Sequence, residues 1–154
     1  MTVEDFLSDL SSSLPAPGGG AAAALAAAMG AALISMVCNL TIGKKQYEQY
    51  EAEMIQVRQR AQKLKDEVLL LMDADARAFS ELMQSFKLPA NTDGEKEKRT
   101  EQIQAKTRQA AEVPAKIAAS CLEIAALADQ IAGKANKNLE SDIKVGIDMA
   151  EAGL

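Results

Sequence analysis

The chain has 154 residues, enough for one domain with one core, and with three Phe, two Tyr and no Trp that core must be aliphatic and rich in alanine. Such a composition favours closely packed helices over a sheet, because β-branched and aromatic strand formers are scarce. A net charge of −5 argues against nucleic-acid binding, and the absence of His removes the commonest general base and the commonest metal ligand.

The first predicted element is a short helix that begins at Thr2, with Asp5 as its capping partner, and that ends in the segment 11–17. An alanine-rich helix follows and runs to about Leu40, with Gly43 as its expected stop.

The stretch from Ala21 to Cys38 holds 18 uncharged residues, which reaches the lower length limit of a membrane span. Most of them are Ala or Gly, whereas insertion is driven by Leu, Ile, Phe and Val. We therefore expect a buried helix of a soluble, cytoplasmic protein with no membrane association.

Gly18, Gly19 and Gly20 stand at the start of this helix, where they let the backbone turn sharply and let a ligand approach the main chain. The free N–H groups of a helix start favour anions. The glycines also fit the dinucleotide-binding pattern G-x-G-x-x-A, but no strand precedes them, so we reject a Rossmann fold.

A second, much longer helix is predicted from near Tyr47 to before Pro89. Its apolar stripe alternates steps of three and four residues, as in helices packed side by side. One place in that stripe is filled by a carboxylate, Asp75.

Thr92 and Glu95 predict a capping box for a third long helix. Pro114 lies inside its apolar pattern and is expected to kink or interrupt it, and Gly133 is expected to end it. After a polar loop, Ser141 and Asp142 are interpreted as the N-cap pair of a last helix. The predicted fold is an all-α, up-and-down bundle with two long helices, one of them kinked near Pro114.

Asp75 has the strongest case for chemistry. A carboxylate on the buried stripe of a helix must be desolvated, paired or exposed to an internal cavity. A desolvated carboxyl group with a raised pKa suits proton transfer. The alternative is a structural carboxylate that pairs with Lys or Arg of a neighbouring helix, and the sequence leaves both open.

Lys44 and Lys45 follow the end of the alanine-rich helix, where cations suit the helix dipole. They are either ligands for a carboxylate-bearing molecule or solvated helix-end charges. Tyr47 could orient a ligand, although its place in the apolar stripe also fits a core residue. Cys38 and Cys121 lie in apolar stretches and are expected to be buried and reduced, and no metal-binding spacing is found.

Several segments, taken in order, resemble one family. They are Pro17-Gly-Gly-Gly20 before the alanine-rich helix, Gly43-Lys-Lys45 before Tyr47, the run 73–79 around Asp75, Lys87-Leu-Pro89, Val113-Pro114, and Asn136 followed by Ser141-Asp142. Together they resemble the cyclodeaminase domain of formiminotransferase-cyclodeaminase and its stand-alone bacterial relatives, some of which are described as methenyltetrahydrofolate cyclohydrolases. The resemblance covers essentially the whole chain.

This resemblance implies a homodimer that binds a tetrahydrofolate derivative near the subunit interface, with no metal or other cofactor. It implies one cyclodeaminase-like helical domain over residues 1–154 that lacks a C-terminal helical segment of the family. Two residues depart from the pattern: Ala21 stands where members often have Ser, and Ala135 where Gly is frequent.

For this function we assign proton transfer to Asp75, with Asp142 as a second carboxylate and Lys44 as the group that holds a folate carboxylate or tunes Asp75. The expected substrate-binding residues are Gly18, Gly19, Gly20, Lys45, Tyr47, Asn136 and Ser141. The leading hypothesis is a formiminotetrahydrofolate cyclodeaminase. The alternatives are a methenyltetrahydrofolate cyclohydrolase and a catalytically silent bundle that binds folate or a partner.

Overall fold

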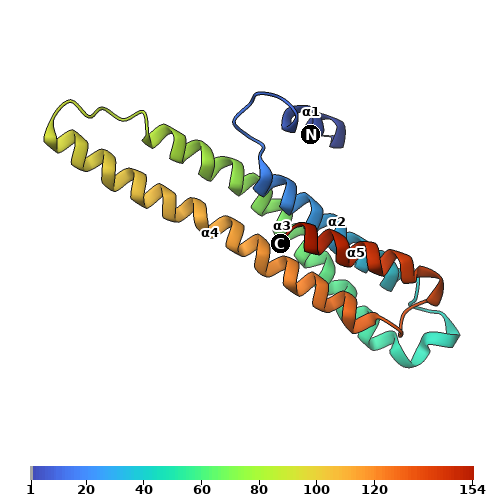
Figure 1. Ribbon diagram of the computed structural model, residues 1–154. Coiled ribbons are helices and arrows are strands. Elements are labelled where there is room, and N and C mark those ends of the chain that lie inside the picture. Colours follow the sequence, from blue (N-terminus) through green and yellow to red (C-terminus); the bar gives the residue numbers. More distant parts are fainter. Residues whose placement is uncertain (1) are drawn as a thin grey trace.

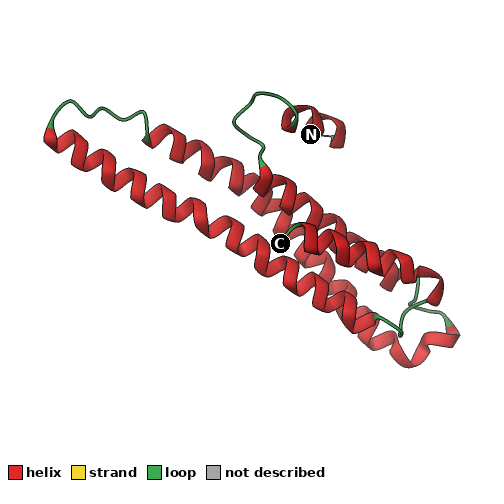
Figure 2. Ribbon diagram, viewed as in Figure 1, coloured by secondary structure: helices red, strands yellow, loops and turns green. Residues whose placement is uncertain are grey.

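The computed structural model describes residues 2–154, and all regular structure in that range is helical (Figures 1 and 2). The elements are α1 (Val3–Leu10), α2 (Gly19–Asn39), the 3₁₀ helix η1 (Lys45–Tyr50), α3 (Glu51–Ser85), α4 (Asp93–Ile131), the 3₁₀ helix η2 (Lys137–Leu139) and α5 (Glu140–Ala152). Helices α2 to α5 run up and down in chain order, and α1 lies apart from them beside the start of α2 (Figure 1). The predicted fold class is confirmed.

Helix α2 is the centre of the bundle, because α3, α4 and α5 all pack against it. Its N-terminal half buries only small residues, namely Ala21, Ala24, Ala27 and Ala28. Farther along, a Cβ added at Gly30 would lie 2.8 Å from the carbonyl oxygen of Gly146 in α5. The absence of side chains at such places lets the helix axes approach more closely than larger residues would allow.

The core has two parts along the bundle axis. Around the N-terminal half of α2, the alanines are covered by larger side chains of α3 and α4, among them Leu64, Val68, Ile117 and Ile124. Around the C-terminal half, α2 itself supplies larger residues, and the cluster includes Ile34, Val37, Met54, Val57, Ile131 and Ile143. The core is therefore aliphatic, as the composition predicts.

By length and composition, α2 is the one helix of the described residues that could cross a membrane, but 56% of its most apolar window is buried inside the protein. Packing against three neighbouring helices accounts for much of that apolar character.

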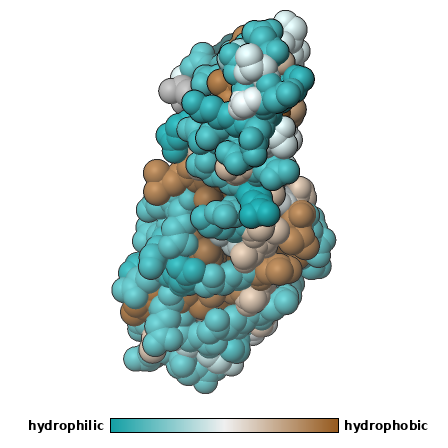
Figure 3. Space-filling view, turned by 90° about the vertical axis from the view of Figure 1, so that its left-hand side faces the viewer, coloured by the Kyte–Doolittle hydropathy of each residue, from teal (hydrophilic) through white to brown (hydrophobic). Residues whose placement is uncertain are grey.

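The distal parts of α3 and α4 extend beyond the other helices as a two-helix arm (Figure 1). The first buried residue of α4 is Val113, twenty residues into the helix, and beyond Val68 the buried residues of α3 are Ala78 and Ser85. Phe79 is 38% exposed. Figure 3 shows separate hydrophobic patches on a mostly hydrophilic face of the molecule. Two helices alone cannot enclose a core, so the arm keeps part of its apolar surface in solvent.

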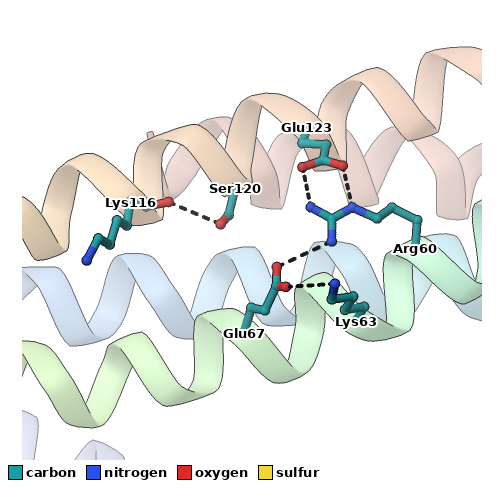
Figure 4. A network of polar contacts seen from close by, with 6 residues as sticks. All are labelled: Arg60, Lys63, Glu67, Lys116, Ser120 and Glu123. Atoms are coloured by element: carbon teal, nitrogen blue, oxygen red, sulfur yellow. Dashed lines mark hydrogen bonds and ion pairs between the residues drawn. The ribbon is translucent and has the colours of Figure 1, made fainter.

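A polar network joins α3 to α4 within the bundle, beside α2 (Figure 4). Arg60 donates from Nε and Nη2 to the two carboxylate oxygens of Glu123, at 2.5 and 2.6 Å, and from Nη1 to Glu67 at 3.5 Å. The pKa of Glu123 is lowered, chiefly by the hydrogen bond from Arg60. This bidentate pair fixes the relative position of the two long helices.

The capping boxes predicted at Thr2 and Thr92 are present, and Gly133 ends α4 with a φ of 74°. The predicted start of the second long helix near Tyr47 is wrong, since residues 45–50 form η1 and α3 begins at Glu51. The tighter turn leaves the Tyr47 hydroxyl where it accepts a hydrogen bond from the Lys137 backbone N–H, at 3.0 Å.

Two further predictions concern α4 and α5. Helix α4 continues through Pro114, so the proline does not interrupt it, and the kink there stays a prediction. The N-cap assigned to Ser141 and Asp142 is wrong: α5 begins at Glu140, after Leu139, which offers no side-chain cap. Because η2 leads directly into α5, the helix starts before the two polar residues, and they lie in its first turn.

The Arg60–Glu123 pair is expected to contribute about 1 kcal/mol of coupling energy to the free energy of unfolding, the upper range for a partly exposed pair. A double-mutant cycle with Arg60→Ala and Glu123→Ala in urea unfolding measures it. The folded-state pKa of Glu123 is lowered, so this coupling should be present at neutral pH and should vanish as the pH falls through that pKa. Lys63→Ala is the control, because its contact with Glu67 is long (3.8 Å) and exposed. A coupling energy of zero at pH 7 would show that the Arg60–Glu123 pair does not stabilise the contact between α3 and α4.

Candidate functional site

Asp75 lies on α3 where that helix passes the first turn of α2. Its carboxyl group occupies the space in which Gly20 has no side chain: a Cβ added at Gly20 would lie 2.5 Å from Asp75 Oδ1 and 2.6 Å from its Cγ. The glycine at this position is therefore needed for the close approach of the carboxylate to the α2 backbone.

The environment of Asp75 favours its neutral form. Burial raises the pKa of the carboxyl group, and the nearby Ala21 backbone N–H offsets part of that rise. Within residues 2–154 no Lys or Arg lies within ion-pair distance of Asp75. The alternative of a structural pair with a basic residue of a neighbouring helix is not realised in this part of the chain.

The glycine turn leaves the start of α2 open. Gly18 is the N-cap and makes no side-chain hydrogen bond to the helix, and neither Gly18 nor Gly19 has a neighbour within 4 Å of an added Cβ. The first backbone N–H groups of α2 are therefore uncapped except where Asp75 approaches. A polar or anionic part of a ligand would find donors here.

A cavity of about 210 Å³ lies between α1, the segment before α2, and α3, and it is lined by neighbours of Asp75 along α3 rather than by Asp75 itself. Its lining includes Phe6, Pro17, Ala21, Met72 and Asp73. This volume is below the roughly 300–1,000 Å³ of typical small-molecule sites, so the cavity can hold only part of a folate-sized ligand. Sequence reasoning missed this lining, because Phe6 and Met72 resemble ordinary core residues.

Lys44 and Lys45 lie at the other end of α2, after the turn at Gly43. Both are exposed and line a cavity of about 340 Å³ together with Glu48 and Glu51. Within residues 2–154 neither lysine is within ion-pair distance of a carboxylate. Their ammonium groups are free to meet an anionic group of a ligand or of another chain.

Tyr47 and Asn136 hold the loops at this same end. Tyr47 joins η1 to the start of η2 through the hydrogen bond from Lys137. Asn136 is buried, donates its backbone N–H to Thr41 Oγ1 at 3.0 Å, and accepts from the Asn138 N–H at 3.2 Å. The buried Thr41, which also donates to the Val37 carbonyl at 2.7 Å, was not singled out from the sequence.

Ser141 and Asp142 belong to this end as well, since they lie in the first turn of α5. Ser141 is exposed and Asp142 is half-buried. An acidic residue in the first turn of a helix interacts favourably with the helix dipole, which gives Asp142 a structural role.

The predicted site residues therefore form two groups at opposite ends of α2 (Figure 1). Asp75 and the three glycines lie at its start, and the lysines, Tyr47, Asn136, Ser141 and Asp142 lie beyond its other end. The 21 residues of α2 separate the groups by about 30 Å. The expectation that Lys44 tunes Asp75 does not hold within one chain, because at that distance charges are screened.

Within residues 2–154 no cluster of three His, Cys, Asp or Glu residues is arranged to hold a metal ion. Cys38 and Cys121 are both buried, as expected, and burial raises the pKa of the Cys38 thiol to about 11. At neutral pH these thiols are protonated and inert.

Residues 2–154 match the family model described as formiminotransferase-cyclodeaminase. The chain belongs to this family. The resemblance carried by the ordered motifs is thereby confirmed, and it places the chain among folate one-carbon cyclodeaminases and cyclohydrolases.

Members of the formiminotransferase-cyclodeaminase family similar to this chain carry two kinds of name. A methenyltetrahydrofolate cyclohydrolase of Methylorubrum extorquens is 46% identical over 153 residues, which cover 99% of this chain and 74% of that protein. The formimidoyltransferase-cyclodeaminase of Gallus gallus is 39% identical over 139 residues, which cover 90% of this chain but only 26% of that protein. The named relatives are enzymes.

A solved structure of the family has the same fold. The formiminotetrahydrofolate cyclodeaminase of Thermotoga maritima superimposes with a TM-score of 0.87 at 29% identity, over 99% of this chain and 72% of that chain. This chain thus spans about three quarters of the two bacterial relatives and about a quarter of the animal protein.

Gly20→Ala is expected to push the Asp75 carboxylate away from the α2 backbone and toward solvent, because the new Cβ takes its place. The pKa of Asp75 should then fall toward the ordinary value of an aspartate. Carbon-13 NMR titration of the carboxyl groups measures this change. Gly19→Ala is the matched control, since its Cβ meets open space one residue earlier. An unchanged titration of Asp75 in Gly20→Ala would refute the close contact.

Asp75→Asn is expected to raise the free energy of unfolding at pH 7 and to change it little at about pH 3. The pKa of Asp75 is raised in the folded state, so ionisation costs stability as the pH rises through that value, and the amide removes this cost. Below the pKa of the unfolded chain both states are protonated and the difference closes. Urea unfolding at several pH values tests the trend, which a pH-independent difference would contradict.

Proposed function

We propose that this chain is a folate one-carbon enzyme in which Asp75 transfers the proton of the reaction. The observation that carries the proposal is the setting of this carboxyl group: its pKa is raised by burial, no basic residue neutralises it, and it lies beside the open start of α2. A general acid or base works best with a pKa near the working pH, and this setting moves an aspartate in that direction.

Of the two reactions named among the relatives, we place methenyltetrahydrofolate hydrolysis first, because the cyclohydrolase is the more similar at 46% identity. A water oxygen bonds to the methenyl carbon, one carbon–nitrogen bond of the five-membered ring breaks, and one proton is released. The ionised Asp75 would accept a proton from the attacking water and return it to the departing ring nitrogen.

The cyclodeaminase reaction is the second candidate, favoured by the TM-score of 0.87 to the Thermotoga maritima enzyme. Here N10 of the folate bonds to the formimino carbon and passes its proton to the imino nitrogen. The bond from carbon to that nitrogen then breaks, and one further proton releases it as ammonia. Protonated Asp75 would supply this last proton.

The uncapped N–H groups at Gly18, Gly19 and Gly20 would receive a polar part of the substrate, while Ala21 offers only its backbone. Lys44 and Lys45 suit the carboxylates of the folate glutamate. Neither reaction requires a metal or redox cofactor. The proposal includes a homodimer in the cytoplasm as the acting form.

Asp75→Asn is expected to lower kcat by about 10²–10⁴-fold, the usual contribution of a general acid or base, while the affinity for folate largely persists. Loss of methenyl absorbance and release of ammonia, each measured with its own substrate, provide the two assays. Asp66→Asn, an exposed carboxylate on the same helix, is the control and should keep full activity.

The same assays decide between the proposed functions. Faster turnover of the methenyl compound supports the cyclohydrolase, and faster ammonia release supports the cyclodeaminase. If Asp75→Asn retains full turnover, Asp75 has no part in the mechanism. If the unsubstituted chain binds both folates and turns over neither, the chain is a silent binding bundle and the enzymatic proposal is wrong.

A further inference from the structure

The two exposed lysines of the candidate site lie in a turn that is anchored at its base. This turn, residues 41–47, follows α2 and leads into η1, and we call it the lysine turn. Gly43 within it has a φ of 78°, a left-handed conformation that glycine adopts without strain. Thr41 at its start is 2% exposed, whereas Lys44 and Lys45 are exposed. The lysine turn therefore buries its first residue and presents its two cations to solvent.

Two consecutive backbone N–H groups of the segment before α5 hold the two ends of the lysine turn. The Asn136 N–H donates to Thr41 Oγ1 at 3.0 Å, and the Lys137 N–H donates to the Tyr47 hydroxyl at 3.0 Å. The Asn136 side chain also donates from Nδ2 to the Leu40 carbonyl, at 3.4 Å. These contacts join positions 90 to 96 residues apart, so they fix the turn relative to the bundle and not only to itself.

The polar atoms of Tyr47 and Asn136 are engaged in internal contacts. Asn136 is 5% exposed, and its Oδ1 accepts from the Asn138 N–H at 3.2 Å while its Nδ2 donates to the Leu40 carbonyl. Tyr47 is half-buried, and its hydroxyl oxygen accepts from the Lys137 N–H. Side chains whose polar groups are satisfied within the fold offer few hydrogen bonds to a ligand, so these contacts fit a role in holding the turn.

The ammonium groups of the lysine turn are available to a ligand. Glu48 and Glu51 line the same cavity of about 340 Å³, but within residues 2–154 neither forms an ion pair with Lys44 or Lys45. A lysine side chain loses much rotamer freedom when it binds an anion, and a mobile backbone would add to that cost. A turn that is already fixed confines the loss to the side chains.

We propose that Thr41 and Tyr47 are positioning residues, which hold the lysine turn against the segment before α5 so that Lys44 and Lys45 present a preformed binding site to the carboxylates of a folate ligand. Neither positioning residue touches the ligand, and each acts through the lysines. The class of ligand in this inference rests on the proposed folate function, whereas the role of the two residues in fixing the turn does not.

Tyr47→Phe tests this role through the loss of one hydroxyl group. The KM for the preferred folate substrate should rise about two- to tenfold, the range expected for one neutral hydrogen bond, while kcat stays unchanged. The KM for the pteroate analogue of that substrate, which lacks the glutamate carboxylates, should not change. Tyr50→Phe is the matched control, because it removes from the same 3₁₀ helix a hydroxyl group that makes none of the contacts described above.

A double-mutant cycle distinguishes positioning from direct contact. Replacing Lys44 and Lys45 together by Ala should raise the KM for the folate substrate by more than Tyr47→Phe does, since both cations are lost. Adding Tyr47→Phe to that pair should raise the KM no further, because the tyrosine acts through the lysines. At the start of the turn, Thr41→Val should behave like Tyr47→Phe, whereas Thr41→Ser, which keeps the hydroxyl group, should retain the original KM.

Amide hydrogen exchange tests the fixing of the turn without a substrate. The Lys137 N–H should exchange faster in Tyr47→Phe than in the unsubstituted chain, because its acceptor is removed, and at an unchanged rate in Tyr50→Phe.

Three outcomes would overturn the inference while leaving the folate function standing. They are a further rise in KM when Tyr47→Phe is added to the two lysine substitutions, an equal rise with the pteroate analogue, and unchanged exchange of the Lys137 N–H. If the unsubstituted chain acts on neither folate, the folate function has failed, and the exchange measurement still decides whether Tyr47 fixes the turn.

Discussion

The bundle depends on how closely the other helices approach α2. Most buried residues in the first half of α2 are alanines, which bury little apolar area each, so the neighbouring helices must supply the bulk of the core through side chains such as Leu64 and Ile117. The close approach of α3 to α2 also forms the candidate site. Asp75 has a short side chain, and it reaches the backbone of α2 only because Gly20 and the alanines after it keep α3 near.

The inner and outer sides of α2 differ in their surroundings, although both are apolar. The inner side needs small residues for close packing, and the outer side is apolar although it faces solvent in the single chain. A helix that is apolar on both sides explains why length and composition alone cannot distinguish it from a membrane span. In this fold α3, α4 and α5 pack against the inner side, and 56% of the most apolar window of α2 is buried.

Features set by neighbouring residues were predictable from the sequence. The capping box at Thr92 and the end of α4 at Gly133 depend on a few adjacent residues, and Asp75 interrupts a local pattern. Features set by distant residues were not. Asp75 meets Gly20 across 55 positions and Arg60 meets Glu123 across 63, and neither pairing leaves a local signal. The role of Asp75 stays a prediction, and the grouping of the candidate residues could not be predicted, because only the fold shows that the lysines lie at the far end of α2 from Asp75.

The two-helix arm has a consequence for the dynamics of the protein. Its residues between Asp93 and Glu112 include none that is buried, and contacts such as the ion pair of Lys106 with Glu81, at 2.7 Å, hold the helices together at the surface. Segments with few buried contacts open at a lower free energy than the global transition. The arm should therefore form a separate unit of local unfolding, whose amides exchange with solvent while those of α2 stay protected. Asp75 lies where the arm joins the bundle, so the carboxyl group to which we assign proton transfer contacts the start of α2 on one side and adjoins the segment expected to open first on the other.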